Sequence, residues 1–374
     1  MLAPMDILDQ LFARASADLH KPAVSDEEIL KRIDYVCRCL TNRAGVRLLM
    51  ACMLAKIDRP DVDPRQPYTE IGGSESFSGR TYDERYITQF INANQLPCNS
   101  TTAFLTPALR NINQPLTKDV EIVGRPTQVY SDTILLLDDV AEGRATAHDI
   151  LTETIRLLLV VRDEKAARMK TLLAGIERGR DALPLASEAI VKLIEQHLAC
   201  KHSSRLPVLV VAAAYSAASD KLGELALPLN PHTAADEQTG AMGDVEICLA
   251  NDDQIVTAYE MKMKRVTKDD VDRAIQKITA RKPRIHNYIF ITTDAIDDQV
   301  REYAATMYEL TSGTEIAVLD CIGFVRHFLH LFHRVRIAFL DAYQDLVLAE
   351  PDSAVSQPLK EAFLSLRQAA ETDE

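Results

Sequence analysis

The sequence lacks the marks of a membrane-spanning, secreted or ATP-driven protein. Its longest apolar run, residues 206–214, is too short to cross a bilayer, and its first residues contain neither the basic nor the apolar segment of a secretory signal. A G-x-x-x-x-G-K-[ST] phosphate-binding motif is absent, as are the Asn-Pro-Pro-Tyr-like and glycine-rich motifs of S-adenosylmethionine-dependent methyltransferases. We therefore expect no role in a membrane, in ATP-driven translocation or in methylation.

The cysteines follow no structural spacing. Seven are present, an odd number, and no pair has C-x-x-C spacing, so neither a zinc ribbon nor a disulfide framework is indicated. These features fit a reducing cytoplasm, which is the location that we expect. The length of 374 residues, of which 47% are hydrophobic and 26% charged, is typical of a soluble globular protein with two domains.

Positive charge is scarce overall but concentrated in one segment. The net charge is −13, which argues against nucleic-acid binding because DNA association needs positive potential to neutralise phosphates. Residues 261–284, however, contain nine basic and three acidic residues, a net charge of +6, whereas residues 341–374 have a net charge of −6. The basic segment predicts a surface that contacts a phosphate backbone, and the alternative is a solvated helix face.

Residues 240–264 have the periodicity of two strands joined by a polar turn. In each strand apolar residues alternate with other residues: Val245, Ile247 and Leu249 with Asp244, Glu246 and Cys248, and Tyr259, Met261 and Met263 with Glu260, Lys262 and Lys264. Each strand therefore has one apolar face and one largely ionisable face. The segment is predicted to be a hairpin.

The length of the turn decides which side chains of the hairpin meet. A three-residue turn, Asn251 to Asp253, pairs Ala250 with Gln254 and brings Asp244 opposite Glu260 on one face. A two-residue turn would put these carboxylates on opposite faces. We predict the three-residue turn.

Two carboxylates and an ammonium on one strand face suit metal-dependent phosphodiester hydrolysis. Asp244 and Glu260 are hard oxygen ligands for Mg²⁺, and Lys262 is placed to orient or polarise a water molecule. The pattern Asp-x(15)-Glu-x-Lys resembles the PD-(D/E)xK nuclease signature, with Gly243 where that family often has proline. The alternative is the exposed polar face of an ordinary hairpin.

The order of elements around the hairpin strengthens this interpretation. A buried helix is predicted before the hairpin, and helix, strand, helix and strand after it, at residues 203–215, 267–278, 286–293, 297–310 and 315–320. This is the α/β order of a PD-(D/E)xK nuclease core, a mixed sheet flanked by helices. We expect that core, with C-terminal helices, in a catalytic domain at residues 181–374.

Residues 1–180 are predicted to form a largely helical DNA-recognition domain with long polar loops. Helices are indicated at residues 6–56 and 148–179, and a polar, proline-punctuated region lies at residues 58–130. Arginine can read guanine and asparagine can read adenine, so the candidates for base contacts in this region are Arg80, Arg85, Arg110, Asn111 and Arg125. The alternative is an irregular loop in which Arg80 pairs with Asp83 or Glu84.

Further DNA contacts are expected from the catalytic half. The segment leading into Asp244 passes close to any bound phosphate, and two lysines follow the predicted site. These candidates are His232, Thr233, Gln238, Lys264 and Lys277.

Several segments together resemble the SacI-type family of type II restriction endonucleases. They are residues 68–73, 77–86, 96–107, 204–209 and 232–247, within a likeness that extends from about residue 58 to 330. The resemblance implies Mg²⁺-dependent cleavage of a short palindrome in double-stranded DNA, a homodimer, and a cognate methyltransferase encoded separately. Two alternatives remain: a PD-(D/E)xK nuclease of the repair or structure-specific type, and a non-catalytic DNA-binding defence module.

Overall fold

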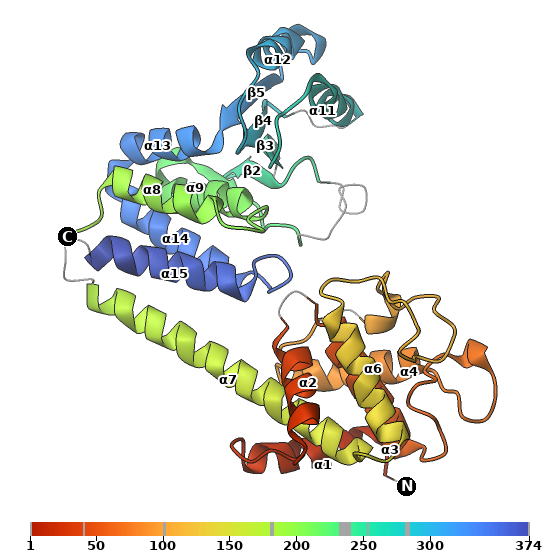
Figure 1. The fold of residues 1–374 in the computed structure, drawn as a ribbon. Coiled ribbons are helices and arrows are strands. Elements are labelled where there is room, and N and C mark those ends of the chain that lie inside the picture. Colours follow the sequence, from red (N-terminus) through yellow and green to blue (C-terminus); the bar gives the residue numbers. More distant parts are fainter. Residues whose placement is uncertain are drawn as a thin grey trace. The chain divides into compact units, whose positions relative to one another are not determined.

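The computed structural model describes residues 2–39, 42–99, 102–179, 183–231, 241–252, 254–280 and 285–372. The chain forms two compact units, Met1–Ala167 and Arg168–Glu374 (Figure 1). The division falls inside helix α7 (Ala147–Gly179), whereas the sequence predicts a boundary near residue 180. No helix in the described ranges is long and apolar enough to cross a membrane.

The N-terminal unit is helical with long irregular connections. Its α-helices before α7 are α1 (Pro4–Ala17), α2 (Glu27–Arg38), α3 (Ala44–Asp58), α4 (Gly79–Tyr82), α5 (Thr88–Ala93) and α6 (Gln128–Ala141). A π-helical turn, η2 (Asp83–Ile87), joins α4 to α5, and 3₁₀ turns lie at Thr69–Ile71 and Ala103–Leu105. Helix α3 is buried along most of its length and packs against α6, α4 and α1, so it forms the centre of this core.

Helix α6 was missing from the sequence prediction, which extends the polar region to residue 130 and resumes helix only at residue 148. The helix has no side-chain N-cap and contains two buried carboxylates, Asp138 and Asp139. Arg65 Nη1 lies 3.3 Å from Asp138 Oδ1, and Arg32 Nη1 lies 2.9 Å from Asp139 Oδ2. Arg65 and Arg32 are distant in sequence, although Arg144 Nε also lies 2.7 Å from Asp139 Oδ1. Local patterns therefore indicate only part of the pairing that makes these charges compatible with burial.

The C-terminal unit is built on a five-stranded mixed sheet in the order β1-β2-β3-β4-β5. The strands are β1 (Glu224–Ala226), β2 (Val245–Leu249), β3 (Ile255–Lys262), β4 (Asn287–Thr292) and β5 (Glu315–Asp320). The pairs β1–β2 and β2–β3 are antiparallel, and β3–β4 and β4–β5 are parallel. The predicted mixed sheet flanked by helices is therefore present, with the short edge strand β1 as an addition that the sequence did not indicate.

Helices cover both faces of this sheet. They are α8 (Ser187–Leu198), α9 (Leu206–Leu222), α11 (Lys268–Ala280), α12 (Asp298–Leu310), α13 (Cys321–Leu331), α14 (Arg336–Ala349) and α15 (Gln357–Thr372). Tyr259 of β3 belongs to the core that includes α9, α13 and α14, whereas its neighbour Ala258 belongs to a second core with α11 and α12. Side chains alternate along a strand, so Glu260 and Lys262 lie on the α11 side of the sheet.

The hairpin has the predicted register at the end that carries the candidate site. Val245 pairs with Tyr259, and Ile247 pairs with Thr257. One further step in this register brings Asp244 opposite Glu260. The two carboxylates therefore share a face, as the three-residue turn predicts.

The predicted pairing at the other end of the hairpin is wrong. Cys248 pairs with Ile255 across a shift in register, so Ala250 does not pair with Gln254. The Ala250 N–H instead donates to the Gly223 carbonyl oxygen at 2.9 Å, which ties the turn to the end of α9. Asp253, the last residue of the predicted turn, lies outside the described residues.

Candidate active site

Glu260 and Lys262 form a direct ion pair on β3. Two residues apart on one strand, they project from the same face, and Lys262 Nζ lies 3.0 Å from Glu260 Oε1. Their side chains are 28% exposed for Lys262 and 16% for Glu260. Both charges are therefore partly withdrawn from water while remaining accessible, as a hydrolytic site requires.

Helix α11 adds a matching set of charges to this pair. Asp270, Arg273 and Lys277 are spaced three and four residues apart, so they share one helix face. Lys277 Nζ lies 3.5 Å from Glu260 Oε2, and Asp270 Oδ1 lies 3.5 Å from Lys262 Nζ. Each charged group of β3 thus faces an opposite charge from α11.

Asp270 is held firmly in place by its neighbours. The N–H and hydroxyl of Thr267 donate to Asp270 Oδ2 at 2.9 and 2.7 Å, and Arg273 Nη2 lies 2.6 Å from Asp270 Oδ1. Burial opposes ionisation of Asp270, but the hydrogen bonds from Thr267 and Arg273 and the charge of Lys262 outweigh it and lower the pKa of Asp270 to about 2. The carboxylate is therefore ionised beside Lys262 at neutral pH.

Asp244 is anchored against β3 next to Glu260. The Met261 N–H donates to Asp244 Oδ2 at 2.7 Å, so the carboxylate takes the place of a strand carbonyl just before β2 begins. Gly243 permits this approach, because a Cβ at that position would overlap the Tyr259 carbonyl group. A proline at residue 243, as in the signature that the sequence resembles, would meet the same obstacle.

Tyr288 of β4 completes the surroundings of Glu260. Its ring is 1% exposed, and its hydroxyl donates to Glu260 Oε2 at 3.1 Å. The register of β3 and β4 pairs Tyr288 with Ala258, so its side chain reaches along the shared face toward Glu260. A neutral donor thus fixes the orientation of the carboxylate.

The donor set fits a magnesium ion. Within the described parts of the chain no three His, Cys, Asp or Glu side chains form a metal-binding group. Mg²⁺ is nevertheless often held by only one or two carboxylates, with water and substrate phosphate as the remaining ligands. Asp244, fixed to the backbone of Met261, and Glu260 are oxygen donors of that kind.

The basic segment around the site is partly neutralised within the protein. Lys264 and Arg265 are exposed, whereas Arg273 pairs with Asp270 and Lys268 Nζ lies 5.4 Å from the centre of the Tyr303 ring. Three further bases, Arg281, Lys282 and Arg284, lie outside the described residues. Lys264 is thus the exposed lysine that directly follows the site on β3.

The candidates for base contacts in the N-terminal unit have different surroundings. Arg80 lies in helix α4, and its Nε lies 2.8 Å from Glu84 Oε1, which is the pairing that the alternative predicts. The other candidates are exposed: Arg85, Arg110, Asn111 and Arg125. Among the described residues, no side-chain hydrogen bond or ion pair is found for Arg85, Arg110 or Arg125. His232, Thr233 and Gln238 lie outside the described residues.

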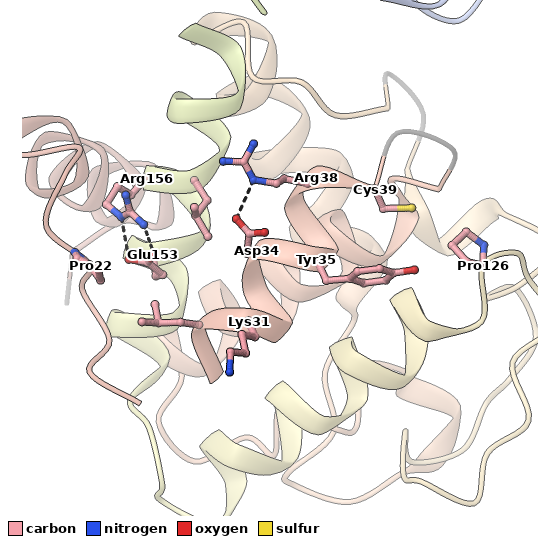
Figure 2. A pocket seen from close by; sticks show the side chains of 11 residues that line it. Pro22, Lys31, Asp34, Tyr35, Arg38, Cys39, Pro126, Glu153 and Arg156 are labelled. Atoms are coloured by element: carbon pink, nitrogen blue, oxygen red, sulfur yellow. Dashed lines mark hydrogen bonds and ion pairs between the residues drawn. The ribbon is translucent and has the colours of Figure 1, made fainter. Parts of the chain in front are cut away.

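A cavity of about 780 Å³ lies in the N-terminal unit, along α2 and α7. Figure 2 shows that its two arginines pair with carboxylates of the same cavity, Arg38 with Asp34 and Arg156 with Glu153. Arg38 also binds Glu164 through Nη1 at 2.7 Å. These cations are already neutralised, so we place the candidate site at Glu260.

Sequence reasoning did not identify Asp270 or Tyr288 as site residues. Asp270 was visible only as an acid in a basic helix, although its place in the first helical turn, three residues after Thr267, is the pattern of a capping interaction. Tyr288 was one apolar residue of a buried strand. Their roles depend on the docking of α11 and on the register of β4.

Residues 184–293 match the family model of the SacI restriction endonuclease C-terminal domain. This segment contains β2, β3, α11 and all contacts to Glu260 and Lys262 described above, including Asp270 and Tyr288. No curated protein matches the chain. The match therefore coincides with the part of the structure in which the candidate site is assembled.

Proposed function

Because residues 184–293 belong to the SacI-type restriction endonuclease family, we propose that the chain is a type II restriction endonuclease. It hydrolyses phosphodiester bonds of double-stranded DNA at a specific sequence, with Mg²⁺ as cofactor. The observation that carries the proposal is the contact between Glu260 and Lys262 at 3.0 Å, beside an anchored Asp244.

The proposed roles follow from these positions. Asp244 and Glu260 would hold Mg²⁺, which supplies Lewis-acid polarisation of the scissile phosphate when bound. Lys262, placed by Glu260 and Asp270, orients the attacking water through its ammonium hydrogens. Asp270 partly balances the positive charge of Lys262. It also keeps the ammonium on the side of β3 that faces the substrate.

The arrangement of strands also supports a PD-(D/E)xK core. An antiparallel pair, β2 and β3, carries the acidic residues, and two parallel strands, β4 and β5, follow. Helix α11 packs on the face that carries the charges. This is the architecture in which the sequence pattern Asp-x(15)-Glu-x-Lys brings its three residues together.

We further propose that the two units divide recognition and catalysis. Arg85, Arg110, Asn111 and Arg125, all exposed, are the candidates for base contacts in the N-terminal unit. Lys264 and Lys277 contact phosphates regardless of sequence. Arg80 is a weaker candidate because Glu84 already pairs with it.

A palindromic site presents two equivalent scissile phosphates. In a dimer with two-fold symmetry, each subunit places the same residues at one of these phosphates. The proposed active form is therefore a homodimer in the cytoplasm. Host DNA would be protected by a methyltransferase encoded separately.

The test is digestion of plasmid DNA by the purified protein with Mg²⁺, with a chelator in the control reaction. Discrete fragments that form with Mg²⁺, and do not form with the chelator, support the proposal. A smear indicates a nuclease of the repair or structure-specific type, and intact DNA indicates a binding module. Sequencing the fragment ends then gives the recognition site and the cleavage position.

A further inference from the structure

The connection between β3 and α11 carries two exposed cations directly after the candidate site. Lys264 and Arg265 follow Lys262 by two and three residues, and both side chains are exposed. Within the part of the chain that the structure describes, neither side chain has a hydrogen bond or ion pair. Both cations are therefore available to an anion from outside the protein.

The peptide group between these two residues is held at both ends by the turn that follows β4. The Thr292 hydroxyl donates to the Lys264 carbonyl oxygen at 3.1 Å, and Asp294 Oδ2 accepts from the Arg265 N–H at 3.1 Å. Because a peptide group is planar, fixing its oxygen and its N–H fixes its orientation. The directions in which the side chains of Lys264 and Arg265 leave the main chain are set with it.

Thr292 and Asp294 are themselves held in place. The Thr292 side chain is 0% exposed, and its hydroxyl oxygen accepts from the Asp294 N–H at 3.1 Å. Asp294 Oδ1 accepts from the Ala295 N–H at 2.7 Å. Each oxygen of the Asp294 carboxylate thus binds a main-chain donor, and the acid orients the connection while the neighbouring cations stay exposed.

We infer that Lys264 and Arg265 together bind a DNA phosphate next to the scissile one, and that Thr292 and Asp294 are positioning residues for this contact. The inference rests on the proposed function and adds Arg265 and the two positioning residues to it. Three extended residues span about 10 Å, and phosphates follow one another every ~3.4 Å along the axis of each strand. A duplex bound at Lys262 therefore brings a neighbouring phosphate within reach of both cations.

Charge and geometry predict opposite effects of removing Asp294. If Asp294 acts only through its charge, Asp294→Ala removes a negative group beside the DNA and strengthens binding. If Asp294 holds the peptide group between residues 264 and 265, the same variant lets Lys264 and Arg265 take other directions. Binding then weakens although the protein has become less negative, so the sign of the change separates the two roles.

The experiment measures binding of the full-length protein to a short fluorescent duplex of arbitrary sequence at several salt concentrations, with a chelator to prevent cleavage. We expect Asp294→Ala to bind roughly fivefold more weakly than the wild type, the scale of an exposed ion pair. The slope of log affinity against log salt should flatten by about one phosphate contact. Lys264→Met and Arg265→Met should each flatten the slope by a similar amount.

Matched variants serve as controls, and thermal unfolding checks that each is folded. Arg265→Lys keeps a cation and should bind like the wild type. Glu302→Ala removes an exposed carboxylate of α12 and should bind at least as tightly as the wild type. Thr292→Val removes the hydroxyl that donates to Lys264 and should weaken binding, whereas Thr292→Ser keeps the hydroxyl and should not.

Binding by Asp294→Ala that is as tight as that of the wild type, or tighter, overturns the inference. Unchanged salt slopes for Lys264→Met and Arg265→Met also overturn it. A plasmid digest of the wild-type preparation keeps these outcomes distinct from failure of the proposed function. If the wild type cleaves with Mg²⁺, only the inference is wrong. If the wild type neither cleaves the plasmid nor binds the duplex, the proposed function is wrong as well.

Discussion

Tyr288 holds Glu260 through a neutral hydrogen bond, so its contribution can be separated from that of the surrounding charges. Tyr288→Phe removes the 3.1 Å contact to Glu260 Oε2 and keeps the buried ring. A hydrogen bond to a charged group contributes about 1.5–3 kcal/mol to stability, so the free energy of unfolding should fall by no more than that amount. We expect the initial rate of plasmid cleavage to fall about tenfold, because Glu260 loses a donor that fixes its orientation.

The matched control is Tyr303→Phe, which removes a hydroxyl that donates to Asp272 on α11 at 2.7 Å. Its cleavage rate should stay at the wild-type level. An unchanged rate for Tyr288→Phe would show that Glu260 does not need this donor.

A second residue-scale prediction concerns the N-terminal unit, where Arg47 and Asp83 form an ion pair with both side chains 0% exposed. Arg47 Nε lies 2.8 Å from Asp83 Oδ1, and Asp83 Oδ2 accepts from Thr102 Oγ1 at 2.6 Å and from the Ala103 N–H at 2.7 Å. This network ties α3 to the segment that carries the candidates for base contacts.

Asp83→Ala leaves the buried Arg47 charge without its partner, which costs about 3–5 kcal/mol. Urea denaturation should show that loss in the N-terminal unit. The double variant Arg47→Met, Asp83→Leu removes both charges and should recover part of it. Equal stabilities of Asp83→Ala and the wild type would contradict this account of the pair.

At the residue scale, the sequence predicted the residues that depend on local alternation. The period of two strands and a three-residue turn predict that Asp244, Glu260 and Lys262 share a face. They share it, but through the register shift between Ile247 and Cys248 and not through the predicted pairing of Ala250 with Gln254. Asp270 and Tyr288 could not be found in this way. Asp270 meets Lys262 only because α11 docks on that face of the sheet, and Tyr288 meets Glu260 only through the parallel register of β3 and β4.

At the scale of elements, the approach of β2 to β3 depends on Gly243. In Gly243→Ala the new Cβ meets the Tyr259 carbonyl, so the start of β2 must move away from β3 and carry Asp244 with it. We expect cleavage to fall about a hundredfold, because misplacing a catalytic group by about 1 Å has an effect of that order. The free energy of unfolding should change far less than the cleavage rate.

Cleavage rates and urea denaturation of Gly243→Ala should be compared with those of Ala250→Ser, an exposed change at the other end of the hairpin. Ala250→Ser should resemble the wild type in both. Full activity of Gly243→Ala would mean that the position of Asp244 does not depend on this close approach.

The packing of α8, α14 and α15 contains a buried histidine whose protonation state is set by its partners. His197 Nε2 lies 3.0 Å from the Leu359 carbonyl oxygen, and Nδ1 lies 2.9 Å from the Tyr343 hydroxyl. A carbonyl only accepts, so Nε2 carries the proton and Nδ1 accepts from Tyr343. Burial lowers the pKa of His197 from 6.5 to about 4.

The unfolded chain takes up a proton at His197 near pH 6.5, and the folded chain does so only near pH 4. The free energy of unfolding therefore decreases as the pH falls from about 6.5 to about 4, by on the order of 3 kcal/mol from this group. Urea denaturation at several pH values should show a shallower fall for His197→Gln than for the wild type. The exposed control His20→Gln should keep the wild-type slope, and identical slopes for all three would exclude a neutral His197.

Element types were predicted more reliably than their connections. The hairpin and the strands β4 and β5 are predicted by their periodicity, whereas the bulge in β3, at the register shift between Ile247 and Cys248, has no signal in the sequence. The three-residue strand β1 is too short for a periodic pattern. Both features depend on contacts between segments that are separated in sequence.

At the scale of the whole molecule, the net charge of −13 does not describe the charges around the candidate site. One acid of the basic segment is used inside it, since Asp270 pairs with Lys262 and Arg273. Lys264 and Arg265 remain exposed next to the site. A protein with a negative net charge can thus carry exposed cations beside the candidate site.

The central claim is that Glu260 makes this protein a metal-dependent nuclease, and digestion of one plasmid by wild-type protein and Glu260→Ala tests it most directly. Glu309→Ala, which removes an exposed carboxylate on α12, serves as the matched control. We predict the same discrete fragments from the wild type and Glu309→Ala in Mg²⁺, and intact plasmid with a folded Glu260→Ala. Cleavage by Glu260→Ala at the wild-type rate would contradict the account.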